Sequence, residues 1–441
     1  MHGLVSAPRA RIAAMLGGGG LVPSFDLNFA RLDNPVTKYG FSFTRATTAT
    51  YVNSTGLIAT AASGELRYTY DPVTLSALGV LIEGARTNLL LNTDTLSTQS
   101  VTVTAVAHTL SFYGTGTVTL SGASTAGPLT GSGAYPTRST LTFTPTAGSL
   151  TLTVTGSVRY ANLEVGSFAT SWIPTTGTAA TRNADVLSLT GAAGRTNLIV
   201  GSAAPITQNV TVTAVPYTLS QTGSGTITLS GASTAGPLVG AGSLTFTPSA
   251  GTLTLTMSGS PAEVQLETGS TATTYIPTTS GPRTVENVAS WFSGDAGTWV
   301  IELIGLSAAS ASTIPAILCV GMGTTSSNED TLFVNSSKRI GCDARSGGTT
   351  VWSLLQSATP GDGAGISVAH AYAVDDAAVS YSGAAAVTDT SCPLPFALDR
   401  VSIGSFVARG TSGYGYLNST ISRIRYYPRR LPNATLKSLT A

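Results

Sequence analysis

The residues of this chain that are best suited to hold a ligand are aromatic and occur in only one copy of an internal repeat. Tyr113 and Tyr135 have no aromatic counterpart in the second copy, and Tyr135 lies with Arg138 in an insertion that the second copy lacks. Loops at one end of a β-sandwich commonly carry binding residues, because the strands carry the fold. We therefore expect these residues to lie in turns and to contact a ligand, with an ordinary surface loop as the alternative. Tyr414, in a glycine-rich turn, is a fourth candidate.

Two further pairs of residues recur at equivalent positions of the copies. Trp172 and Tyr275 each precede an Ile-Pro dipeptide. Such rings can stack on the face of a sugar, but their recurrence beside a strand end favours packing at the bottom of each domain. Glu164 and Glu267 also recur. A glycosidase needs two carboxylates roughly 5 to 10 Å apart, and neither copy has an obvious second one. We expect a structural hydrogen bond instead, donated to the glutamate by the repeated Arg86 or Arg195.

Nothing in the sequence predicts a metal site, a cofactor site or a catalytic centre. The histidines share no ligand spacing and the cysteines have no CxxC pattern, so neither a zinc site nor a disulfide framework is indicated. Motifs of serine esterases, zinc proteases and P-loop enzymes are absent from the sequence. Asp362, Asp375 and Asp376 could bind calcium from loops, although solvated turns are the preferred interpretation. We expect no catalysis, no metal and no cofactor.

Composition favours a β-rich chain that binds no nucleic acid and does not insert into a membrane. Charged residues make up 10% of the 441 residues, well below the usual share, while glycine alone accounts for 49. The net charge of +1 gives no overall field that would attract a polyanion. No stretch approaches the roughly 20 uninterrupted apolar residues of a membrane-spanning helix. The length predicts roughly three or four domains.

One module occurs twice in the chain. Residues 119–129 (TLSGASTAGPL) recur unchanged as residues 228–238, and residues 100–129 match residues 209–238 at 23 of 30 positions. Chance does not produce this agreement, so we expect an array of separately folding units. Such arrays more often present a surface or span a distance than build one catalytic cleft.

Within each copy, apolar residues alternate with threonine. In residues 101–105 (VTVTA) and 150–154 (LTLTV), every second side chain is apolar, which places valine and leucine on one face of a strand and hydroxyl groups on the other. Glycines between these runs indicate turns. Short alternating strands over about 100 residues predict a two-sheet antiparallel sandwich. Residues 299–303 and 421–431 predict similar strands and therefore a third sandwich.

These observations divide the chain into consecutive parts. They are an N-terminal arm with a glycine hinge (1–21), a β-rich connector (22–85), the first repeat (86–190), the second repeat (191–295) and a C-terminal sandwich (296–441). The connector is short for a core of its own. We expect it to pack against the first repeat or against a neighbouring subunit.

Several motifs resemble modules of tailed-bacteriophage virion proteins. Residues 41–57 (FSFTRATTATYVNSTGL) and 79–90 (GVLIEGARTNLL) are similar to a segment common in those proteins. The motifs NLE, ATSWIP and TRNAD within residues 162–185 resemble the closing motif of their carbohydrate-binding-module-like jelly rolls. Residues 421–431 (ISRIRYYPRRL) resemble the end of their concanavalin-A-like, or laminin-G-like, domains.

The resemblance implies an all-β protein with two duplicated jelly rolls and a concanavalin-A-like sandwich after a short N-terminal attachment arm. It further implies a non-enzymatic virion protein on the surface of the phage particle, most simply a tail fibre-type appendage that recognises host cell-surface polysaccharide. The expected partners are other virion proteins, bound through the arm, and further copies of the chain in a homotrimer.

Two other functions stay open from the sequence. A head fibre, a capsid decoration protein or a tail spacer would use the sandwiches only for assembly. An enzyme acting on capsule polysaccharide would need two carboxylates that face each other across a groove. Exposed aromatic rings specific to one copy would favour adhesion, whereas burial of those rings in subunit contacts would favour assembly.

Overall fold

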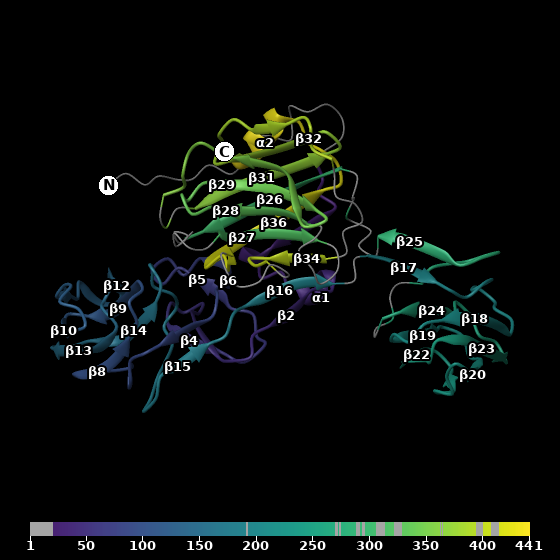
Figure 1. Ribbon diagram of the computed structural model, residues 1–441, viewed down its shortest axis with the longest axis horizontal. Coiled ribbons are helices and arrows are strands. Elements are labelled where there is room, and N and C mark those ends of the chain that lie inside the picture. Colours follow the sequence, from purple (N-terminus) through teal and green to yellow (C-terminus); the bar gives the residue numbers. More distant parts are fainter. Residues whose placement is uncertain are drawn as a thin grey trace. The chain divides into compact units, whose positions relative to one another are not determined.

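The chain folds almost entirely into antiparallel β-structure (Figure 1). The computed structural model describes residues 21–190, 193–269, 272, 275–287, 292, 296–305, 314–321, 329–361, 363, 365–393, 400–406 and 414–441. Within these residues, helix is confined to the short α1 (Pro35–Tyr39), α2 (Asn433–Thr440) and a single 3-10 turn, Phe29–Arg31. The predicted all-β fold of antiparallel sandwiches is confirmed. Residues 1–20 of the N-terminal arm lie outside the described residues.

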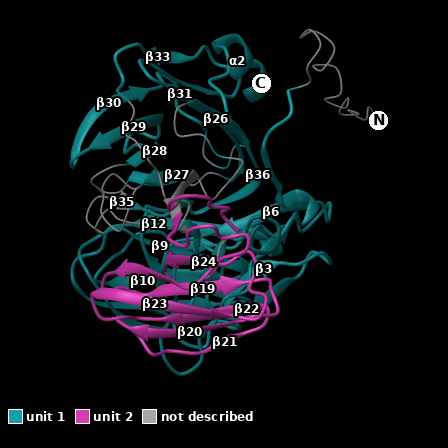
Figure 2. Cartoon of the chain, turned by 90° about the vertical axis from the view of Figure 1, so that its right-hand side faces the viewer, with its two compact units in different colours: residues 1–189, 291–396, 401–441 teal, residues 190–290, 397–400 magenta. Residues whose placement is uncertain are grey.

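The chain forms two compact units (Figure 2). Unit 1 comprises residues 1–189, 291–396 and 401–441, and unit 2 comprises residues 190–290 and 397–400. Unit 1 therefore holds the connector, the first repeat and the C-terminal sandwich, while unit 2 is essentially the second repeat.

The first repeat is a sandwich of a sheet β11-β10-β13-β8 and a sheet β12-β9-β14, with β7 paired to β15. Its strands are β7 (Arg86–Asn88), β8 (Gln99–Val103), β9 (His108–Gly114), β10 (Thr117–Gly122), β11 (Leu129–Thr130), β12 (Gly133–Phe143), β13 (Gly148–Thr155), β14 (Arg159–Val165) and β15 (Ala180–Arg182). The alternation seen in the sequence places Leu110, Phe112 and Leu163 in its core, fully buried. Each such side chain contributes roughly 1.5 to 3 kcal/mol when it leaves water.

The second repeat has the same topology, with sheets β18-β23-β20-β21 and β22-β19-β24 and the pair β17 with β25. Its strands are β17 (Ala193–Asn197), β18 (Gln208–Val212), β19 (Tyr217–Gln221), β20 (Thr226–Gly231), β21 (Leu238–Val239), β22 (Gly242–Phe246), β23 (Gly251–Ser258), β24 (Gln265–Thr268) and β25 (Arg283–Asn287). The six residues that the second copy lacks shorten one strand, because β22 has 5 residues where β12 has 11.

A buried asparagine closes each repeat. Asn88 of β7 donates from Nδ2 to the carbonyls of Ala161 and Ile173, and its Oδ1 accepts from two backbone amides of the same repeat. Asn197 of β17 makes the equivalent four bonds in the second repeat. The Arg-Thr-Asn tripeptide that opens each copy therefore recurs for a structural reason, since an amide side chain can satisfy two donors and two acceptors at once.

The C-terminal sandwich consists of two facing sheets. One runs β33-β32-β31-β26-β36-β6-β5, with β1 also paired to β36, and the other runs β2-β16-β34-β27-β28-β29-β30, with β35 beside β27. The first contains β1 (Phe25–Asn28), β5 (Tyr68–Tyr70), β6 (Ala77–Ile82), β26 (Ala296–Ile304), β31 (Ile366–Ala373), β32 (Asp376–Tyr381), β33 (Val387–Asp389) and β36 (Ser419–Tyr427). The second contains β2 (Ser42–Thr44), β16 (Val186–Thr190), β27 (Ile314–Gly321), β28 (Glu329–Val334), β29 (Ile340–Ser346), β30 (Thr349–Leu355), β34 (Arg400–Ile403) and β35 (Tyr414–Gly415).

Strands of the connector are part of this C-terminal sandwich. β6 pairs with one end of β36, with Val80 opposite Ile421, and β1 pairs with the rest of the same edge, with Leu27 opposite Ile424. β2 joins the second sheet through β16, which is the last segment of residues 86–190. The sandwich is thus assembled from the connector and from the end of the predicted first repeat as well as from the C-terminal segment. The remaining connector strands, β3 (Ala49–Val52) and β4 (Ile58–Ala61), form a hairpin.

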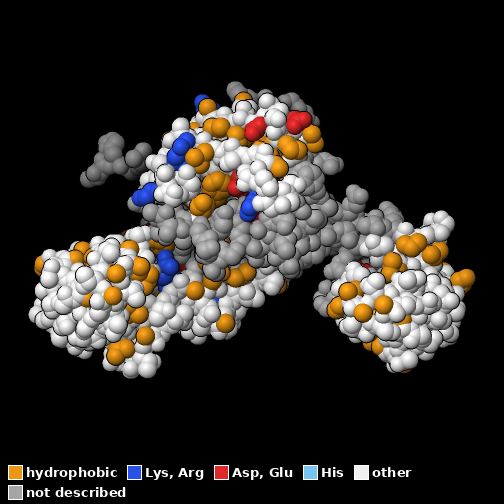
Figure 3. Space-filling view, viewed as in Figure 1, with side chains coloured by type: hydrophobic (Ala, Val, Ile, Leu, Met, Phe, Trp, Pro, Cys, Tyr) orange, Lys and Arg blue, Asp and Glu red, His pale blue; other side chains and the backbone are white. Residues whose placement is uncertain are grey.

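The core of the C-terminal sandwich contains aromatic residues and a buried charged pair. Trp299 of β26 packs against Phe25 of β1 and Tyr426 of β36, with ring centroids 6.1 and 4.6 Å away. Between the two sheets, His370 of β31 contacts Asp330 of β28 at 2.8 Å. No described helix is long and apolar enough to cross a membrane. The visible surface carries few charged side chains and only scattered apolar ones, as the composition predicts (Figure 3).

Candidate functional site

A cleft of about 310 Å³ opens in unit 1 where the connector, the first repeat and the C-terminal sandwich meet. The first repeat supplies Tyr113 of β9, Arg138 of β12 and Trp172, which lies between β14 and β15. The connector contributes residues of β3 to β6, and the C-terminal sandwich contributes the end of β26 and the start of β36. Three segments far apart in the sequence therefore form its walls.

Four aromatic side chains form a continuous row beside this cleft. Ring centroids are 5.3 Å apart for Tyr135 and Tyr113, 6.2 Å for Tyr113 and Tyr160, and 4.7 Å for Tyr160 and Trp172. All four side chains are half-buried. Tilted contacts at this spacing are favourable beyond simple area burial. We refer to Tyr135, Tyr113, Tyr160 and Trp172 as the aromatic row.

Arg138 is held against the aromatic row. Its guanidinium lies 5.7 Å from the centroid of the Tyr113 ring. Its Nη1 donates to the carbonyl of Thr170 at 2.5 Å, and Nη2 donates to Ser111 Oγ at 2.7 Å. Next to Tyr113 in the row, the Tyr135 hydroxyl donates to the carbonyl of Gly56 in the connector at 2.7 Å. Burial, followed by the neighbouring Tyr113, raises the pKa of Tyr135 to about 12, so this hydroxyl stays protonated.

The row is specific to the first repeat. Thr222 occupies the position equivalent to Tyr113, Glu263 that of Tyr160 and Tyr275 that of Trp172, while Tyr135 and Arg138 fall in the insertion. The backbone itself is kept, since Tyr160 and Glu263 both have φ of 49°. Two copies of one fold thus differ in the side chains at one end of the sandwich, which is where duplicated domains acquire separate binding properties.

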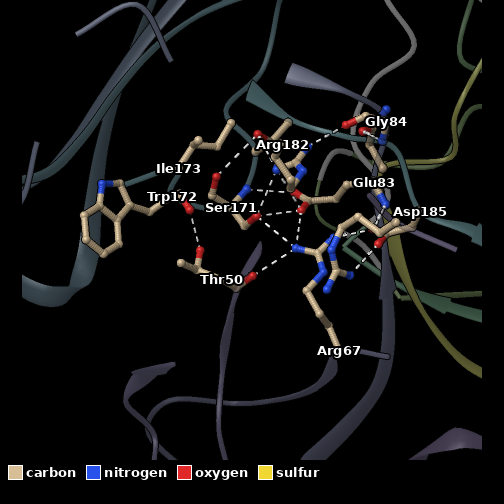
Figure 4. A network of polar contacts seen from close by, with 12 residues as sticks. Thr50, Arg67, Glu83, Gly84, Ser171, Trp172, Ile173, Arg182 and Asp185 are labelled. Atoms are coloured by element: carbon tan, nitrogen blue, oxygen red, sulfur yellow. Dashed lines mark hydrogen bonds and ion pairs between the residues drawn. The ribbon is translucent and has the colours of Figure 1, made fainter. Parts of the chain in front are cut away.

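A buried ionic network fixes the wall of the cleft (Figure 4). Arg67 binds Glu83 at 2.7 Å and also binds Asp185, which in turn accepts from Arg45 at 2.9 Å. Arg182 lies 3.0 Å from Glu83. Burial raises the pKa of Glu83, but the guanidinium groups of Arg182 and Arg67 lower it by more, to about 2. Glu83 is therefore ionised, and its charge is compensated inside the protein.

The network positions the segment that carries Trp172. Glu83 accepts from the backbone N of Ser171 at 2.7 Å and from Ser171 Oγ at 2.6 Å, and Thr50 donates to the carbonyl of Trp172. The indole ring points away from these charges (Figure 4). The charged side chains therefore hold the segment in place, while the indole of Trp172 borders the cleft.

Three of the predicted binding residues come together here. Tyr113, Tyr135 and Arg138 are mutual neighbours, and the cleft is lined by Tyr113 and Arg138. Their predicted location in turns is wrong: Tyr113 lies in β9 and the other two in β12, because the inserted residues lengthen that strand. The backbone of Tyr414 forms β35, beside β27. The side chain of Tyr414 lies outside the described part of the chain.

Sequence reasoning missed Tyr160 and the charged network. Tyr160 could have been found by the same comparison of the copies, because its counterpart is Glu263. Arg45, Glu83 and Asp185 gave no such signal. A charged residue beside a short strand is ordinarily read as exposed, and only the tertiary fold shows that these are buried.

Trp172 and Tyr275, which recur at equivalent positions, form hydrogen bonds within their own repeats. Trp172 Nε1 donates to Thr93 Oγ1 at 3.2 Å, and the Tyr275 hydroxyl bonds to Ser202 Oγ, at the equivalent position, at 2.7 Å. Trp172 additionally contacts Tyr160 and borders the cleft, so internal packing and exposure to the cleft coexist in the first repeat.

The buried glutamates make structural hydrogen bonds. Glu164 accepts from the backbone N and Oγ1 of Thr170 at 2.8 and 2.7 Å. Arg86 Nε forms an ion pair with Glu164 at 3.6 Å, which is too long for the hydrogen bond expected from the sequence. Glu267 accepts from Gln265 at 2.8 Å. The side chain of Arg195 lies outside the described residues. Neither glutamate is among the described residues that line the cleft.

In the described part of the chain, no group of three or more histidine, cysteine or carboxylate side chains could hold a metal ion. Of the aspartates considered for calcium, Asp376 pairs with Arg430 at 2.7 Å. Asp375 lies in a turn with φ of 55°. Asp362 lies outside the described residues.

No family model matches the chain, and no curated protein matches it. Among solved structures, it is similar to CBM40 of Ruminococcus gnavus IT-sialidase bound to α2,3-sialyllactose, with 21% identity over 35% of this chain and 88% of that chain and a TM-score of 0.30. A leech intramolecular trans-sialidase gives 18% identity over 34% of this chain and 23% of that chain, with a TM-score of 0.28. Trypanosoma rangeli sialidase gives 13% identity over 35% of this chain and 24% of that chain, also with a TM-score of 0.28. These values are too low to support a functional argument.

Proposed function

We propose that this chain is a non-enzymatic appendage protein of a tailed-bacteriophage particle, of tail-fibre type, and that it binds host surface glycan in the cleft beside the aromatic row. The observation that carries the proposal is the row itself. Half-buried rings line up next to an open cleft in the first repeat, whereas the second repeat keeps the fold with a single ring, Tyr275, at the equivalent positions. Rings present in the first copy alone are not needed for the fold, so they serve contact.

The chemistry of the cleft suits a sugar. Aromatic faces stack on the apolar faces of pyranose rings, and hydroxyl-bearing side chains such as Thr50 and Thr420 border the same space. A single carboxylate, Glu83, lines the described cleft, and it is engaged by two arginines. Hydrolysis by paired carboxylates would need a second one, which supports binding without catalysis.

The phage assignment is supported by the motifs in the sequence and by their placement. Arg45, Glu83, Arg182 and Asp185 all belong to the segments that resemble phage virion proteins, and they meet in one buried network. Weak contacts of single sandwiches gain strength when several copies act together on one particle, which suits a homotrimer attached to the virion through the N-terminal arm.

The binding test uses the full chain on an array of bacterial surface polysaccharides, followed by titration with Trp fluorescence. Trp172 borders the cleft, whereas Trp299 and Trp352 are buried. We expect a bound glycan to quench Trp172, and Tyr113→Thr, which copies Thr222, to weaken binding about three- to tenfold. Thr222→Ala is the matched control in the second repeat. Binding that Tyr113→Thr leaves unchanged would place the glycan elsewhere, and no binding would refute the proposal.

The position on the particle needs a separate test. Gold-labelled antibody against residues 296–441 is applied to intact particles and read by electron microscopy. Label on tail-borne filaments supports the appendage. Label spread over the capsid would instead favour a head fibre or decoration protein.

A further inference from the structure

The cleft carries a positive charge that the protein does not compensate. Arg138 lines it, and in the described part of the chain no carboxylate pairs with its guanidinium. Glu83, the other charged side chain among the described lining residues, is already bound by Arg67 and Arg182. Arg138 is therefore the charge that a ligand would meet.

The surrounding network does not supply spare negative charge. Its described members are Arg45, Arg67, Arg86, Arg138 and Arg182 with Glu83, Glu164 and Asp185. Each of the three carboxylates has an arginine partner of its own, so none is left for Arg138. The local excess is positive, although the whole chain is nearly neutral at +1.

Arg138 is held in place before any ligand arrives. The bonds to Thr170 and Ser111 use two of the five N–H groups of the guanidinium, and the Tyr113 ring supports one face. A guanidinium is a planar fork that matches the oxygens of a carboxylate or a phosphate. Because its orientation is already fixed, less rotamer entropy is lost when an anion binds.

We propose that the ligand of this cleft is an acidic saccharide, whose carboxylate or phosphate binds Arg138 while a sugar ring stacks on the aromatic row. This inference rests on the proposed glycan-binding function and narrows it to one chemical class. A neutral sugar would cover the partly buried Arg138 and displace its water without supplying a counter-charge, which is unfavourable for a cation. An acidic sugar supplies the missing partner.

The first experiment compares matched polysaccharides. Bacterial surface polysaccharides are printed in native form, after reduction of uronic acids to neutral sugars, and after removal of phosphate esters. We expect the full chain to bind native acidic polymers and to lose at least about tenfold in affinity for one treated form. Loss after carboxyl reduction identifies a carboxylate, and loss after dephosphorylation identifies a phosphate. Equal binding of the native and both treated forms overturns the acidic-ligand inference but leaves glycan binding intact, whereas no binding at all refutes both.

The second experiment assigns the charge to Arg138. Arg138→Gln should lower the affinity for the acidic glycan about tenfold or more, and added salt should no longer weaken binding. Arg138→Lys should restore part of the affinity and part of the salt dependence. Arg31→Gln, which removes an exposed charge from the connector, is the control for net charge. Thermal unfolding of each variant separates a loss of contact from a loss of fold. A stable Arg138→Gln variant that still discriminates acidic from neutral glycan would contradict the inference.

Discussion

Arg182 Nη1 lies 3.0 Å from Glu83 Oε2, and this contact joins the last strand of the first repeat to the end of the connector. The same carboxylate binds Arg67 and accepts from Ser171. Buried charges are tolerated only when each has partners, so the orientation of the repeat on the connector is tightly specified. The cleft lies beside this junction, and its geometry therefore depends on this network.

Removing the central carboxylate should destabilise unit 1 strongly. Glu83→Gln leaves Arg67 and Arg182 buried beside a neutral side chain. This should lower the free energy of unfolding by about 3 to 5 kcal/mol. The control is Asp94→Asn, which breaks the pair with Arg159, where the side chains are 61% and 47% exposed. That exposed pair should change stability by at most about 1 kcal/mol. Calorimetry of the unit 1 transition measures both, and equal effects would contradict a structural role for the network.

Acid should protonate Glu83 and thereby break the same network. The pKa of Glu83 is lowered from 4.5 to about 2, so the stability that it contributes is present above pH 4.5 and is lost as the pH falls toward 2. The unfolding temperature of unit 1 should therefore drop over this interval, and Glu83→Gln should remove part of the drop. Circular dichroism melts between pH 5 and 2 test this. An unchanged acid dependence in Glu83→Gln would show that other groups control it.

The sequence predicted those features that have a local or repeated signature. Alternation of valine and leucine with threonine identified the sandwiches, and comparison of the two copies identified Tyr113 and Arg138 at the cleft. Pairing of β6 with β36 could not be predicted, because Val80 and Ile421 are far apart in the chain and either strand would read as an ordinary edge. Burial of Glu83 was hidden for the same reason, since only long-range contacts bring its partners together.

Alkaline pH should weaken the C-terminal sandwich. Burial lowers the pKa of His370, but the Asp330 carboxylate at 2.8 Å and the neighbouring Cys342 raise it by more, well above 6.5. A raised pKa contributes stability that is present below pH 6.5 and is lost as the pH rises through the folded value. NMR titration of His370 should show the raised pKa, and Asp330→Asn should abolish it. An ordinary pKa in the wild-type protein would contradict the buried ion pair.

The recurring asparagines should be among the most sensitive positions of the repeats. Asn88→Ala leaves two backbone carbonyls and two backbone amides without partners inside the first repeat, at about 1 to 3 kcal/mol for each group that stays unsatisfied. Asn197→Ala should lower the free energy of unfolding of unit 2 by a similar amount, since the Asn197 side chain makes the equivalent hydrogen bonds there. Denaturant melts of each variant check this. A mild effect at both positions would show that water replaces the amide.

The parts of the chain should differ in whether they fold alone. Residues 190–290 contain a complete pair of sheets and a core of their own, so this fragment should give a cooperative melt and dispersed NMR spectra. Residues 296–441 lack β1 and β6, which pair with the edge of β36, β5, which pairs with β6, and also β2 and β16 from the facing sheet. An uncovered edge of this kind promotes aggregation. We therefore expect the C-terminal fragment to be insoluble or poorly folded, and a soluble, cooperatively folding fragment 296–441 would show that the connector strands are dispensable.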